Sequence, residues 1–368
     1  MQVVFEIIGM GAKKYGGFER YILEEARQLK ERGYKLVVVF DTQPLADRYI
    51  EDLLHVGASY YVIPYQNKLR FTSAIFKLMR KYRPEVVHSN FSSNIFLVQI
   101  MACLMHVSVR ISTEHCLPVL STCKRRFLYT FLSILTNYIL PVSAQSAQAV
   151  QKGLWLNKSK VKTLYLGVND FAYEKSEMKK KYGLPMDKLL IMNVAYHHPV
   201  KGVDVLLRAF ALLLKYPGVK DVVLCQIGGG QTGHDTSALK SLARSLGIED
   251  RVIWMGLQNN VPEILSCGDI YCQPSRSEGI GLAIMEASLA RLPVVATRVG
   301  GIPEVAVDKV NAYLVESEDA DGLAGSMYML YKDKAQRERM GYHGRLQALD
   351  KFCLSNQVTK LIECFYKI

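Results

Sequence analysis

The chain has 368 residues, of which 49% are hydrophobic and 22% charged, so it can bury large cores and extensive disorder is excluded. At roughly 150 residues per domain, this length predicts two domains. The formal net charge is +12, and the first 170 residues carry 22 basic and 12 acidic side chains, so most of the surplus lies in the first half. Such a surplus favours a nucleic acid, an anionic membrane or a phosphorylated substrate as partner.

Targeting and redox signals are few. The eight cysteines form no CxxC pair and have no histidine spacing suited to zinc, which is typical of reduced thiols in the cytoplasm. The first nine residues lack a basic region and a cleavage site, so we expect no signal peptide. Polar residues interrupt the longest apolar stretch, residues 127–142, and it is not predicted to span a membrane.

Short β-branched runs alternate with amphipathic segments through the first half. Helices are expected at residues 18–32 and 71–82, among others. This alternation predicts βαβ units with right-handed crossovers. The predicted strands are residues 3–8, 36–40, 60–63, 86–88, 107–112, 137–142 and 161–166.

The same alternation restarts after a polar, lysine-rich interval at residues 169–187. The fold class is therefore α/β, with two doubly wound, Rossmann-like domains at residues 1–168 and 169–349 and a cleft between them. Residues 350–368 are predicted to form a helix with no strand after it. The predicted strands of the second half are residues 189–194, 222–227, 252–254, 270–273, 293–296 and 312–315.

A GxGxxG pattern occupies residues 228–233, directly after a predicted strand. In a dinucleotide site such glycines let backbone N–H groups approach a pyrophosphate. The acids at the required distance, Glu249 and Asp250, precede the next strand instead of ending it. We therefore favour a structural strand-to-helix turn, and an NAD-dependent oxidoreductase is the alternative.

Asp319 and Asp321 form a DxD pattern that could hold a divalent ion. An apolar helical run follows them, and acidic residues are favoured in the first turn of a helix. We therefore predict that these aspartates cap a helix.

The segment after the strand at residues 270–273 combines a glycine-containing turn with a helix that begins near Gly281. Backbone N–H groups at such a helix start form an anion site suited to a diphosphate. Glu278 lies in the turn and Glu286 one to two turns inside the helix, where carboxylates can accept hydrogen bonds from sugar hydroxyls. The alternative is that both glutamates only face solvent.

Polar residues also follow other predicted strands. Lys201 lies in a strand-to-helix loop, where a lysine can neutralise a phosphate or simply face solvent. Gly16 and Gly17 lie in the first βα loop, and His88 and His115 end strands on the same side of the sheet. Two histidines at this edge are either structural or functional.

Taken in order, these residues resemble the retaining glycosyltransferases of family GT4, which have the GT-B fold. The resemblance covers nearly the whole chain and includes the EX7E spacing of Glu278 and Glu286. Its other motifs are Gly16-Gly17 with Glu19, Val87-His88, Glu114-His115, Val142-Ser143, Leu166-Gly167-Val168-Asn169, Lys201-Gly202, Gly228-Gly229-Gly230, Pro274-Ser275, Pro293-Val294-Val295-Ala296-Thr297 and Gly300-Gly301-Ile302-Pro303-Glu304.

The resemblance implies that the second domain binds a nucleoside diphosphate sugar. It implies a ribose contact for Glu286, a sugar contact for Glu278 and a phosphate contact for Lys201, and it implies that the final helix crosses back onto the first domain. Further contacts are implied for residues of both domains: Gly279, Ile280, Gly281 and Leu282 with the sugar and diphosphate, Gly16 and Gly17 with the phosphates or acceptor, and His115 with the reacting sugar.

The chain departs from the family at one position. The family usually has an arginine five residues before the lysine, where this chain has Tyr196. Charge on the departing diphosphate would then be stabilised by Lys201 and the helix start at Gly281. His197, His198 and Arg276 are further candidates for this role.

We therefore predict a retaining glycosyltransferase that uses no metal or other cofactor and transfers a sugar from a nucleoside diphosphate sugar to an acceptor hydroxyl. His115, Lys201 and Glu278 are the predicted catalytic residues. The acceptor is expected to be a saccharide or a lipid-linked saccharide, in the assembly of a bacterial-type cell-surface polysaccharide or glycolipid. The expected location is the cytoplasm, at the inner face of the membrane.

A basic segment leads into an apolar helix in the first half. Lys124, Arg125 and Arg126 directly precede Phe127, which predicts contact with an anionic membrane. A core helix with a solvated first turn is the alternative. Basic and aromatic residues do not interleave as stacking platforms would, so no nucleic acid partner is expected. A basic membrane-binding protein without enzymatic activity is the alternative function.

Overall fold

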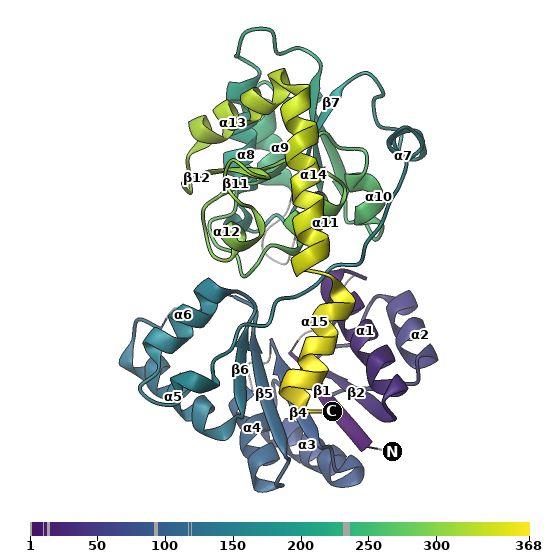
Figure 1. Cartoon of the computed structure of the whole chain (residues 1–368), viewed down its shortest axis with the longest axis vertical. Helices are drawn as coiled ribbons and strands as arrows, with labels where there is room; N and C mark the ends of the chain where they lie inside the picture. The colour runs from purple at the N-terminus through teal and green to yellow at the C-terminus, as the bar shows by residue number, and fades with distance from the viewer. Residues whose placement is uncertain are drawn as a thin grey trace. The chain divides into compact units, whose positions relative to one another are not determined.

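The computed structural model describes residues 2–9, 11–12, 15–91, 95–116, 118, 120–230 and 236–368. The chain forms two compact units (Figure 1). The first unit comprises Met1–Gly167 together with Leu354–Ile368, and the second comprises Val168–Cys353.

The first unit is built on a parallel six-stranded sheet in the order β3-β2-β1-β4-β5-β6. The order reverses direction between β1 and β4, which makes the sheet doubly wound. Its strands are β1 (Gln2–Ile8), β2 (Tyr34–Phe40), β3 (Ser59–Val62), β4 (Val86–Asn90), β5 (Val109–Glu114) and β6 (Tyr138–Pro141). Its helices before the domain boundary are α1 (Gly17–Glu31), α2 (Asp47–His55), α3 (Lys68–Tyr82), α4 (Ile95–Leu104), α5 (Cys123–Leu135), α6 (Ala144–Gly153) and the short 3-10 helix η1 (Lys158–Lys160).

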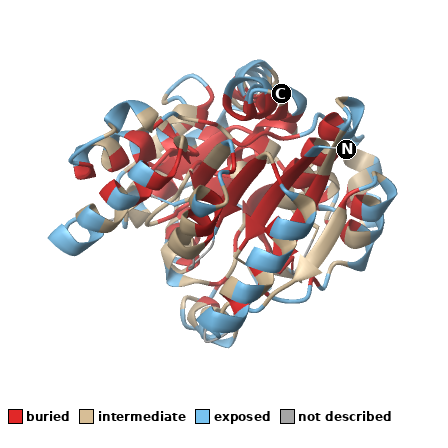
Figure 2. Ribbon diagram, turned by 90° about the horizontal axis from the view of Figure 1, so that it is seen from below, coloured by how far each residue is buried: buried red, intermediate tan, exposed pale blue. Residues whose placement is uncertain are grey.

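Strand β1 shows why these strands have nearly continuous apolar sequences. Val3, Phe5 and Ile7 pack into one apolar cluster with side chains of α3 and α4. Residues of the other face, including Glu6, are equally buried. A parallel strand covered on both faces needs apolar side chains at every position, so Glu6 is an exception. Figure 2 shows the buried strands between helices whose outer faces are exposed.

The strand predicted at residues 161–166 was wrong. This segment lies beside β6, and the N–H groups of Lys162 and Leu164 donate to β6 carbonyls at 3.0 and 3.1 Å. Only Val161 forms a bridge with β6, and no ladder follows. Val161, Leu164 and Leu166 are buried. The apolar pattern of this segment therefore reflects the burial of its side chains and not pairing as a strand.

The second unit has a parallel six-stranded sheet of the same kind, in the order β12-β11-β10-β7-β8-β9. All six strands predicted in this half form, so the predicted α/β class with two doubly wound sheets is confirmed. The strands are β7 (Leu189–Val194), β8 (Val222–Ile227), β9 (Val252–Gly256), β10 (Ile270–Gln273), β11 (Val294–Thr297) and β12 (Ala312–Val315). The helices are α7 (Lys175–Lys181), η2 (Pro199–Lys201), α8 (Val203–Leu213), α9 (Ser237–Ser245), η3 (Glu249–Arg251), α10 (Val261–Leu265), α11 (Leu282–Leu289), α12 (Ile302–Val305), α13 (Ala320–Lys332) and α14 (Lys334–Lys351).

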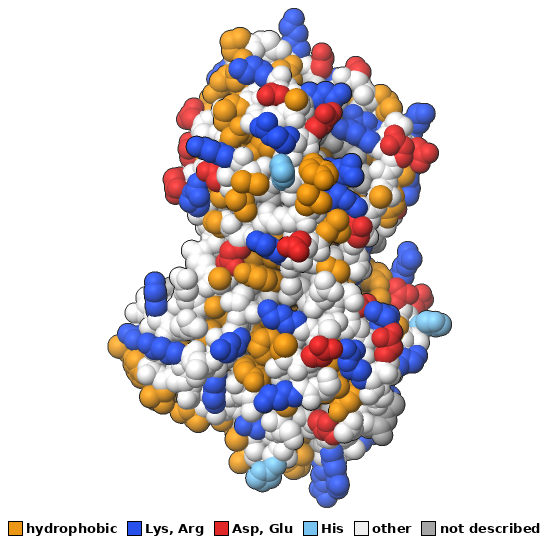
Figure 3. Space-filling view, in the orientation of Figure 1, with side chains coloured by type: hydrophobic (Ala, Val, Ile, Leu, Met, Phe, Trp, Pro, Cys, Tyr) orange, Lys and Arg blue, Asp and Glu red, His pale blue; other side chains and the backbone are white. Residues whose placement is uncertain are grey.

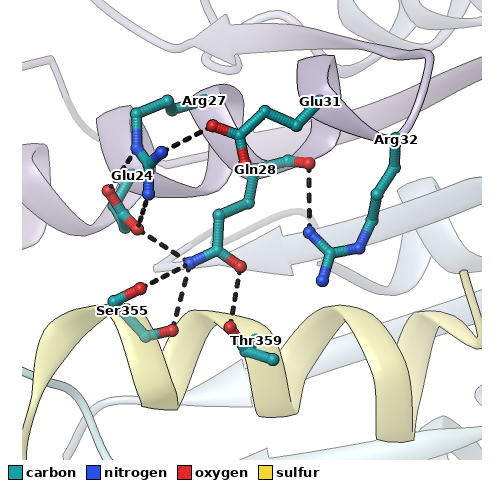
Figure 4. A network of polar contacts seen from close by, with 7 residues as sticks. All are labelled: Glu24, Arg27, Gln28, Glu31, Arg32, Ser355 and Thr359. Carbon is teal, nitrogen blue, oxygen red and sulfur yellow. Dashed lines mark hydrogen bonds and ion pairs between the residues drawn. The ribbon is translucent and has the colours of Figure 1, made fainter.

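The C-terminal segment packs on α1 of the first unit. It consists of α15 (Leu354–Lys360) and one π-helical turn, η4 (Leu361–Tyr366). The amide of Gln28 donates to Ser355 and accepts from Thr359, at 3.1 and 2.9 Å (Figure 4). The sequence analysis placed the start of the C-terminal helix at residue 350. In the structure Asp350 and Lys351 instead belong to the last turn of α14.

No helix in the described ranges is long and apolar enough to cross a membrane.

Candidate functional site

Residues predicted to hold the donor lie on the loop between β10 and α11 of the second unit. The carboxylate of Glu278 accepts three hydrogen bonds at Oε1: from Lys201 Nζ at 2.7 Å, Ser275 Oγ at 2.8 Å and Gln273 Nε2 at 3.0 Å. The side chains of Lys201 and Glu278 are 27% and 10% exposed, so the ion pair is screened from water only in part. The structure thus brings two of the predicted catalytic residues into direct contact.

Two glycines allow neighbouring loops to reach this turn. Gly202, directly after Lys201, has φ of +65°, and a Cβ there would lie 2.0 Å from the carbonyl oxygen of Pro274. Gly300 has φ of +53°, and a Cβ there would lie 1.8 Å from the carbonyl oxygen of Glu278. Any larger residue would push these loops apart. Gly202 and Gly300, one from each of two predicted motifs, are therefore packing requirements of the turn.

The turn ends at the start of α11. Gly281 is the N-cap of this helix, and neither a capping side chain nor an acidic residue occupies its first turn. The first N–H groups of a helix have no intrahelical partner and carry partial positive charge. Ile280 is only 3% exposed, so its side chain packs inward. The start of α11 therefore offers backbone donors and a favourable dipole to an anion.

Glu286 lies on α11 and is half-buried. Burial is the main cause of the strongly raised pKa of Tyr271, and the charges of Glu278 and Glu286 raise it further. Both carboxylates therefore act on the same buried phenol of β10.

Arg276 and His197 are engaged in other contacts. The Arg276 guanidinium forms a bidentate pair with Asp204, at 2.9 and 2.8 Å, and also binds Glu318. His197 is 6% exposed, and its two ring nitrogens each lie 2.9 Å from a side-chain oxygen, of Thr236 and of Gln226. Both side chains are therefore held by partners within the second unit.

His198 caps the short helix η2. Its Nδ1 accepts a hydrogen bond from the Val200 N–H at 3.1 Å. This contact makes His198 part of the turn that presents Lys201. Lys201 and the uncapped start of α11 both adjoin the turn that carries Glu278.

The predicted residues of the first unit lie at the start of α1 and after β5. The N–H of Gly16 donates to Glu19 at 2.9 Å, which caps α1, and Gly17 is the first residue of that helix. Phe18 meets the ring of His115 edge to face, with centroids 5.2 Å apart. Gly16, Gly17 and His115 therefore lie in one neighbourhood of the first unit.

His115 is held on several sides. Phe91 stacks on its ring with centroids 3.7 Å apart and an interplanar angle of 16°. Its Nε2 lies 2.7 Å from Oδ1 of Asn90. Burial lowers the pKa of His115 to about 3, so the imidazole is neutral at pH 7.

His88, the other histidine at a strand end, is structural. Its ring is 3% exposed, with Nδ1 2.8 Å from the Tyr366 hydroxyl and Nε2 2.7 Å from Thr113 Oγ1. Nδ1 is also 2.5 Å from Glu6 Oε1. Burial lowers the pKa of His88 to about 4. Its partners place it between the sheet and the C-terminal segment.

The two motifs with alternative interpretations serve the fold. Gly228 has φ of +133°, and a Cβ there would lie 1.9 Å from the carbonyl oxygen of Ala195, so the glycine allows two loops to meet. Residues 231–233 of the predicted glycine loop lie outside the described residues. Asp319 accepts from the Gly322 N–H at 2.8 Å, which confirms helix capping. In the described part of the chain, no three His, Cys, Asp or Glu side chains gather as a metal ion would require.

Sequence reasoning missed several residues around these sites. Gln273 was predicted only as the last residue of a strand. Its hydrogen bond to Glu278 depends on the path of the loop between them, which the sequence does not show. Glu6 was missed entirely, although a lone acid in an otherwise apolar strand is a detectable signal. Asn90 lies just beyond the strand predicted at residues 86–88 and was assigned no role, but it joins Glu6 to His115.

Two family models match the chain in succession. Residues 15–170 match the model described as Glycosyltransferase Family 4, and residues 174–347 match the one described as Glycosyl transferases group 1. Together they cover most of both units but not the C-terminal segment, residues 354–368.

Curated relatives agree with these matches. An N-acetyl-alpha-D-glucosaminyl L-malate synthase of Bacillus anthracis is 30% identical over 56% of this chain and 54% of its own length. A UDP-Gal:alpha-D-GlcNAc-diphosphoundecaprenol alpha-1,3-galactosyltransferase of Escherichia coli is 22% identical over 95% of this chain and 93% of its own. The chain thus spans about half the length of the first of these relatives and nearly all of the second.

Solved structures share the fold over the whole chain. Anabaena HepE in complex with UDP and glucose has a TM-score of 0.84 at 17% identity, covering 99% of this chain and all of its own. A glycosyltransferase from Rickettsia africae also has a TM-score of 0.84, at 19% identity, covering 100% of this chain and 99% of its own. These likenesses confirm the GT-B fold.

Proposed function

The chain belongs to the group 1 glycosyltransferases of family GT4, and on that premise we propose that it transfers a sugar from a nucleoside diphosphate sugar to an acceptor hydroxyl, with retention of configuration. The observation that carries this proposal is the Lys201–Glu278 pair beside the start of α11. A cation, a helix dipole and a carboxylate are the groups that recognise a diphosphate joined to a sugar.

In this proposal Lys201 and the N–H groups at the start of α11 stabilise the charge that develops on the departing diphosphate. They supply this stabilisation without a metal ion, and no other cofactor is required. The Lys201 ammonium is paired with Glu278 in the structure, and in this proposal it also contacts a phosphate of the bound donor. The hydrogen bonds described above all reach Glu278 at Oε1, so Oε2 is the oxygen we assign to a sugar hydroxyl.

The remaining predicted residues complete the proposed site. Glu286 would accept hydrogen bonds from the ribose hydroxyls. The backbone of residues 279–282 would contact the sugar and the diphosphate. Gly16 and Gly17 at the start of α1 would let the phosphates or the acceptor approach, and His115 would contact the reacting sugar. The acceptor hydroxyl would attack the face that the diphosphate leaves, through an oxocarbenium-like transition state.

The names of relatives suggest which substrates to test first. HepE was crystallised with UDP and glucose, and the Escherichia coli relative is named for UDP-Gal and a diphosphoundecaprenol-linked acceptor. We propose a UDP-hexose donor and a saccharide acceptor linked by diphosphate to a lipid, in the assembly of a cell-surface polysaccharide or glycolipid.

A surface of the first unit suits such an acceptor. On α5, Phe127, Phe131 and Ile134 recur at helical spacing and are 58%, 36% and 53% exposed. Lys124 lies one turn before Phe127 on the same face and is also exposed. We propose that this α5 surface contacts an anionic membrane at its cytoplasmic face.

The loop after α6 extends the α5 surface. Trp155 and Leu156 are 48% and 52% exposed, and the Arg126 guanidinium lies 5.6 Å from the centre of the Trp155 ring. Figure 3 shows basic and hydrophobic side chains together on this part of the first unit. Aromatic rings beside cations are favoured where hydrocarbon meets charged headgroups.

The activity is tested with a panel of nucleotide sugars and a diphosphate-lipid-linked saccharide, by measuring release of nucleoside diphosphate. We expect release from one UDP-hexose, and strongly reduced release by Glu278→Gln. NMR of the product should show the anomeric configuration of the donor. Absence of release from every donor, with every acceptor, would refute the proposed function.

The membrane contact is tested separately with anionic vesicles. Reversing Lys124, Arg125 and Arg126 to glutamate should weaken vesicle binding. The matched control reverses Lys68, Lys77 and Arg80, which are exposed on α3 of the same unit. Equal effects of the two triple variants would show that net charge alone, and not the α5 surface, governs binding.

A further inference from the structure

A chain of buried hydrogen bonds in the first unit ends at His115. It begins at Tyr366 in the C-terminal segment, whose hydroxyl lies 2.7 Å from Oε1 of both Glu6 and Glu25. Glu6 Oε2 in turn lies 2.6 Å from Nδ2 of Asn90, and Asn90 Oδ1 lies 2.7 Å from Nε2 of His115. Glu6 and Glu25 are fully buried and Asn90 is 2% exposed.

The direction of each hydrogen bond follows from the donors available. Burial raises the pKa of Glu6 to about 8, so its carboxyl carries a proton at pH 7. Oε1 lies beside the Tyr366 oxygen and His88 Nδ1, either of which can accept this proton in a hydrogen bond. Oε2 is then the acceptor for the Asn90 amide N–H. This orients Asn90 with its carbonyl oxygen toward His115.

A carbonyl oxygen can only accept a hydrogen bond, so the facing Nε2 of His115 must carry a proton. The imidazole is neutral because burial lowers its pKa to about 3. A neutral imidazole has one N–H, so Nδ1 keeps the lone pair. Phe18 and Phe91 fix the plane of the ring and therefore the direction of that lone pair.

We propose that Asn90, oriented by Glu6, is a positioning residue that fixes His115 in the Nε2-protonated tautomer, so that Nδ1 accepts a hydrogen bond from a hydroxyl of the sugar substrate. The contact with substrate rests on the proposed function, whereas the tautomer is a property of the protein alone. Tyr366 anchors the other end of this chain from a segment 360 residues away from Glu6.

A purely structural role would require only that Asn90 and Glu6 satisfy each other in the core. Such a role would leave the tautomer of His115 free, because either ring nitrogen of an unconstrained imidazole can carry the proton. The tautomer is therefore the readout that separates the two roles.

The experiment uses the full chain labelled with 15N at histidine, with the His115 signals identified by their loss in His115→Gln. At pH 7 the wild-type ring should show the Nε2–H tautomer, and it should not protonate down to pH 5. An Nδ1–H tautomer or an imidazolium in the wild type would overturn the proposal, whatever the variants do.

Two variants of Asn90 then test the cause. Asn90→Leu keeps the side-chain size without an acceptor, and it should give mixed tautomers and about a 10-fold lower kcat with donor KM changed less than 2-fold. Asn90→Asp restores an acceptor oxygen, and it should recover the tautomer and most of kcat. An unchanged tautomer in Asn90→Leu would overturn the proposal. If that variant does not fold, failure of Asn90→Asp to keep the wild-type tautomer would do so.

These readouts keep the inference separate from the proposed function. A wild-type chain with the expected tautomer but no sugar transfer would refute the function and leave the positioning of His115 standing. Sugar transfer together with the wrong tautomer would refute only the positioning.

Discussion

The second unit presents its candidate residues as a partly exposed ion pair, whereas the first unit presents them as neutral groups in a buried network. Lys201 and Glu278 keep 27% and 10% of their side chains exposed and form an ion pair. In the first unit, burial raises the pKa of Glu6 to about 8 and lowers that of His88 to about 4. Low dielectric favours the neutral forms of these groups. The buried network therefore acts through the direction of its hydrogen bonds and not through charge.

This difference suits the parts of the proposed reaction. A departing diphosphate needs positive charge that can move toward it, and a partly exposed lysine provides this. A histidine ring that must accept a hydrogen bond from one hydroxyl in one direction has to be held rigidly, and a buried hydrogen-bond network can hold it. The contrast therefore predicts that changes at the Lys201–Glu278 pair alter rate with little change in stability, and that changes in the buried network alter stability and its pH dependence.

The largest effect is expected at the Lys201–Glu278 ion pair of the second unit. Lys201→Met should lower the rate of nucleoside diphosphate release by about 100-fold or more, because it removes a cation that stabilises charge in the transition state. Its free energy of unfolding should change by less than about 1 kcal/mol, since the pair is partly solvated.

The matched control for this variant is Lys181→Met. Lys181 forms an ion pair with Glu263 at 2.5 Å in the same unit, but on α7 and α10. The control should keep the wild-type rate. Equal losses in both variants would show that loss of any such ion pair, and not the position of Lys201, impairs the enzyme.

The next effect concerns the buried network and pH. Because the pKa of Glu6 is raised from 4.5 to about 8 in the folded chain, the folded state holds a proton between these values that the unfolded state releases. Stability must therefore fall as pH rises through this window, by at most about 1.4 kcal/mol per pH unit for one group. Glu6→Gln should remove this contribution.

The measurement is urea unfolding of the first unit between pH 6.5 and 8. Below pH 6.5 the lowered pKa values of His88 and His115 act in the opposite direction, since the unfolded state then binds protons that the folded state does not. Glu51→Gln, at an exposed position of α2, should keep the wild-type slope. A slope unaffected by Glu6→Gln would mean that Glu6 is not protonated in the folded chain.

The smallest effect distinguishes a cap from a site. Asp319→Ala should lower the stability of the second unit by about 1 kcal/mol, because the Gly322 N–H loses its acceptor. The rate of sugar transfer at saturating substrate should not change. A loss of activity that added Mg2+ restores would instead support a metal role for the DxD pattern.

Much of the fold could be predicted because its signals are local. The alternation of β-branched runs with amphipathic segments located six strands in each half, and glycine-containing turns marked where loops approach each other. The exception, residues 161–166, has the composition of a strand, but its ladder does not form beyond Val161. An apolar composition indicates that a segment is buried. A β-ladder also requires a neighbouring strand in register.

The candidate site could be predicted in part. Glu278 and the start of α11 were predicted from one glycine-containing turn after a strand. Lys201 was predicted from another loop that follows a strand. The engagement of Arg276 with Asp204 could not be predicted, because the two residues are 72 positions apart. The same is true of Gln273 as a partner of Glu278, since its role depends on the path of the loop.

What the sequence alone determined was the parallel α/β architecture, the restart of the pattern after residue 169, and the order of motifs that marks the family. Only the tertiary structure decided that His88 is structural while His115 is held by Asn90, and that Glu6 in the first strand shares Tyr366 with Glu25. The physical reason is that periodicity and turn preference act between near neighbours. The state of a buried acid or imidazole depends instead on partners that folding brings from distant parts of the chain.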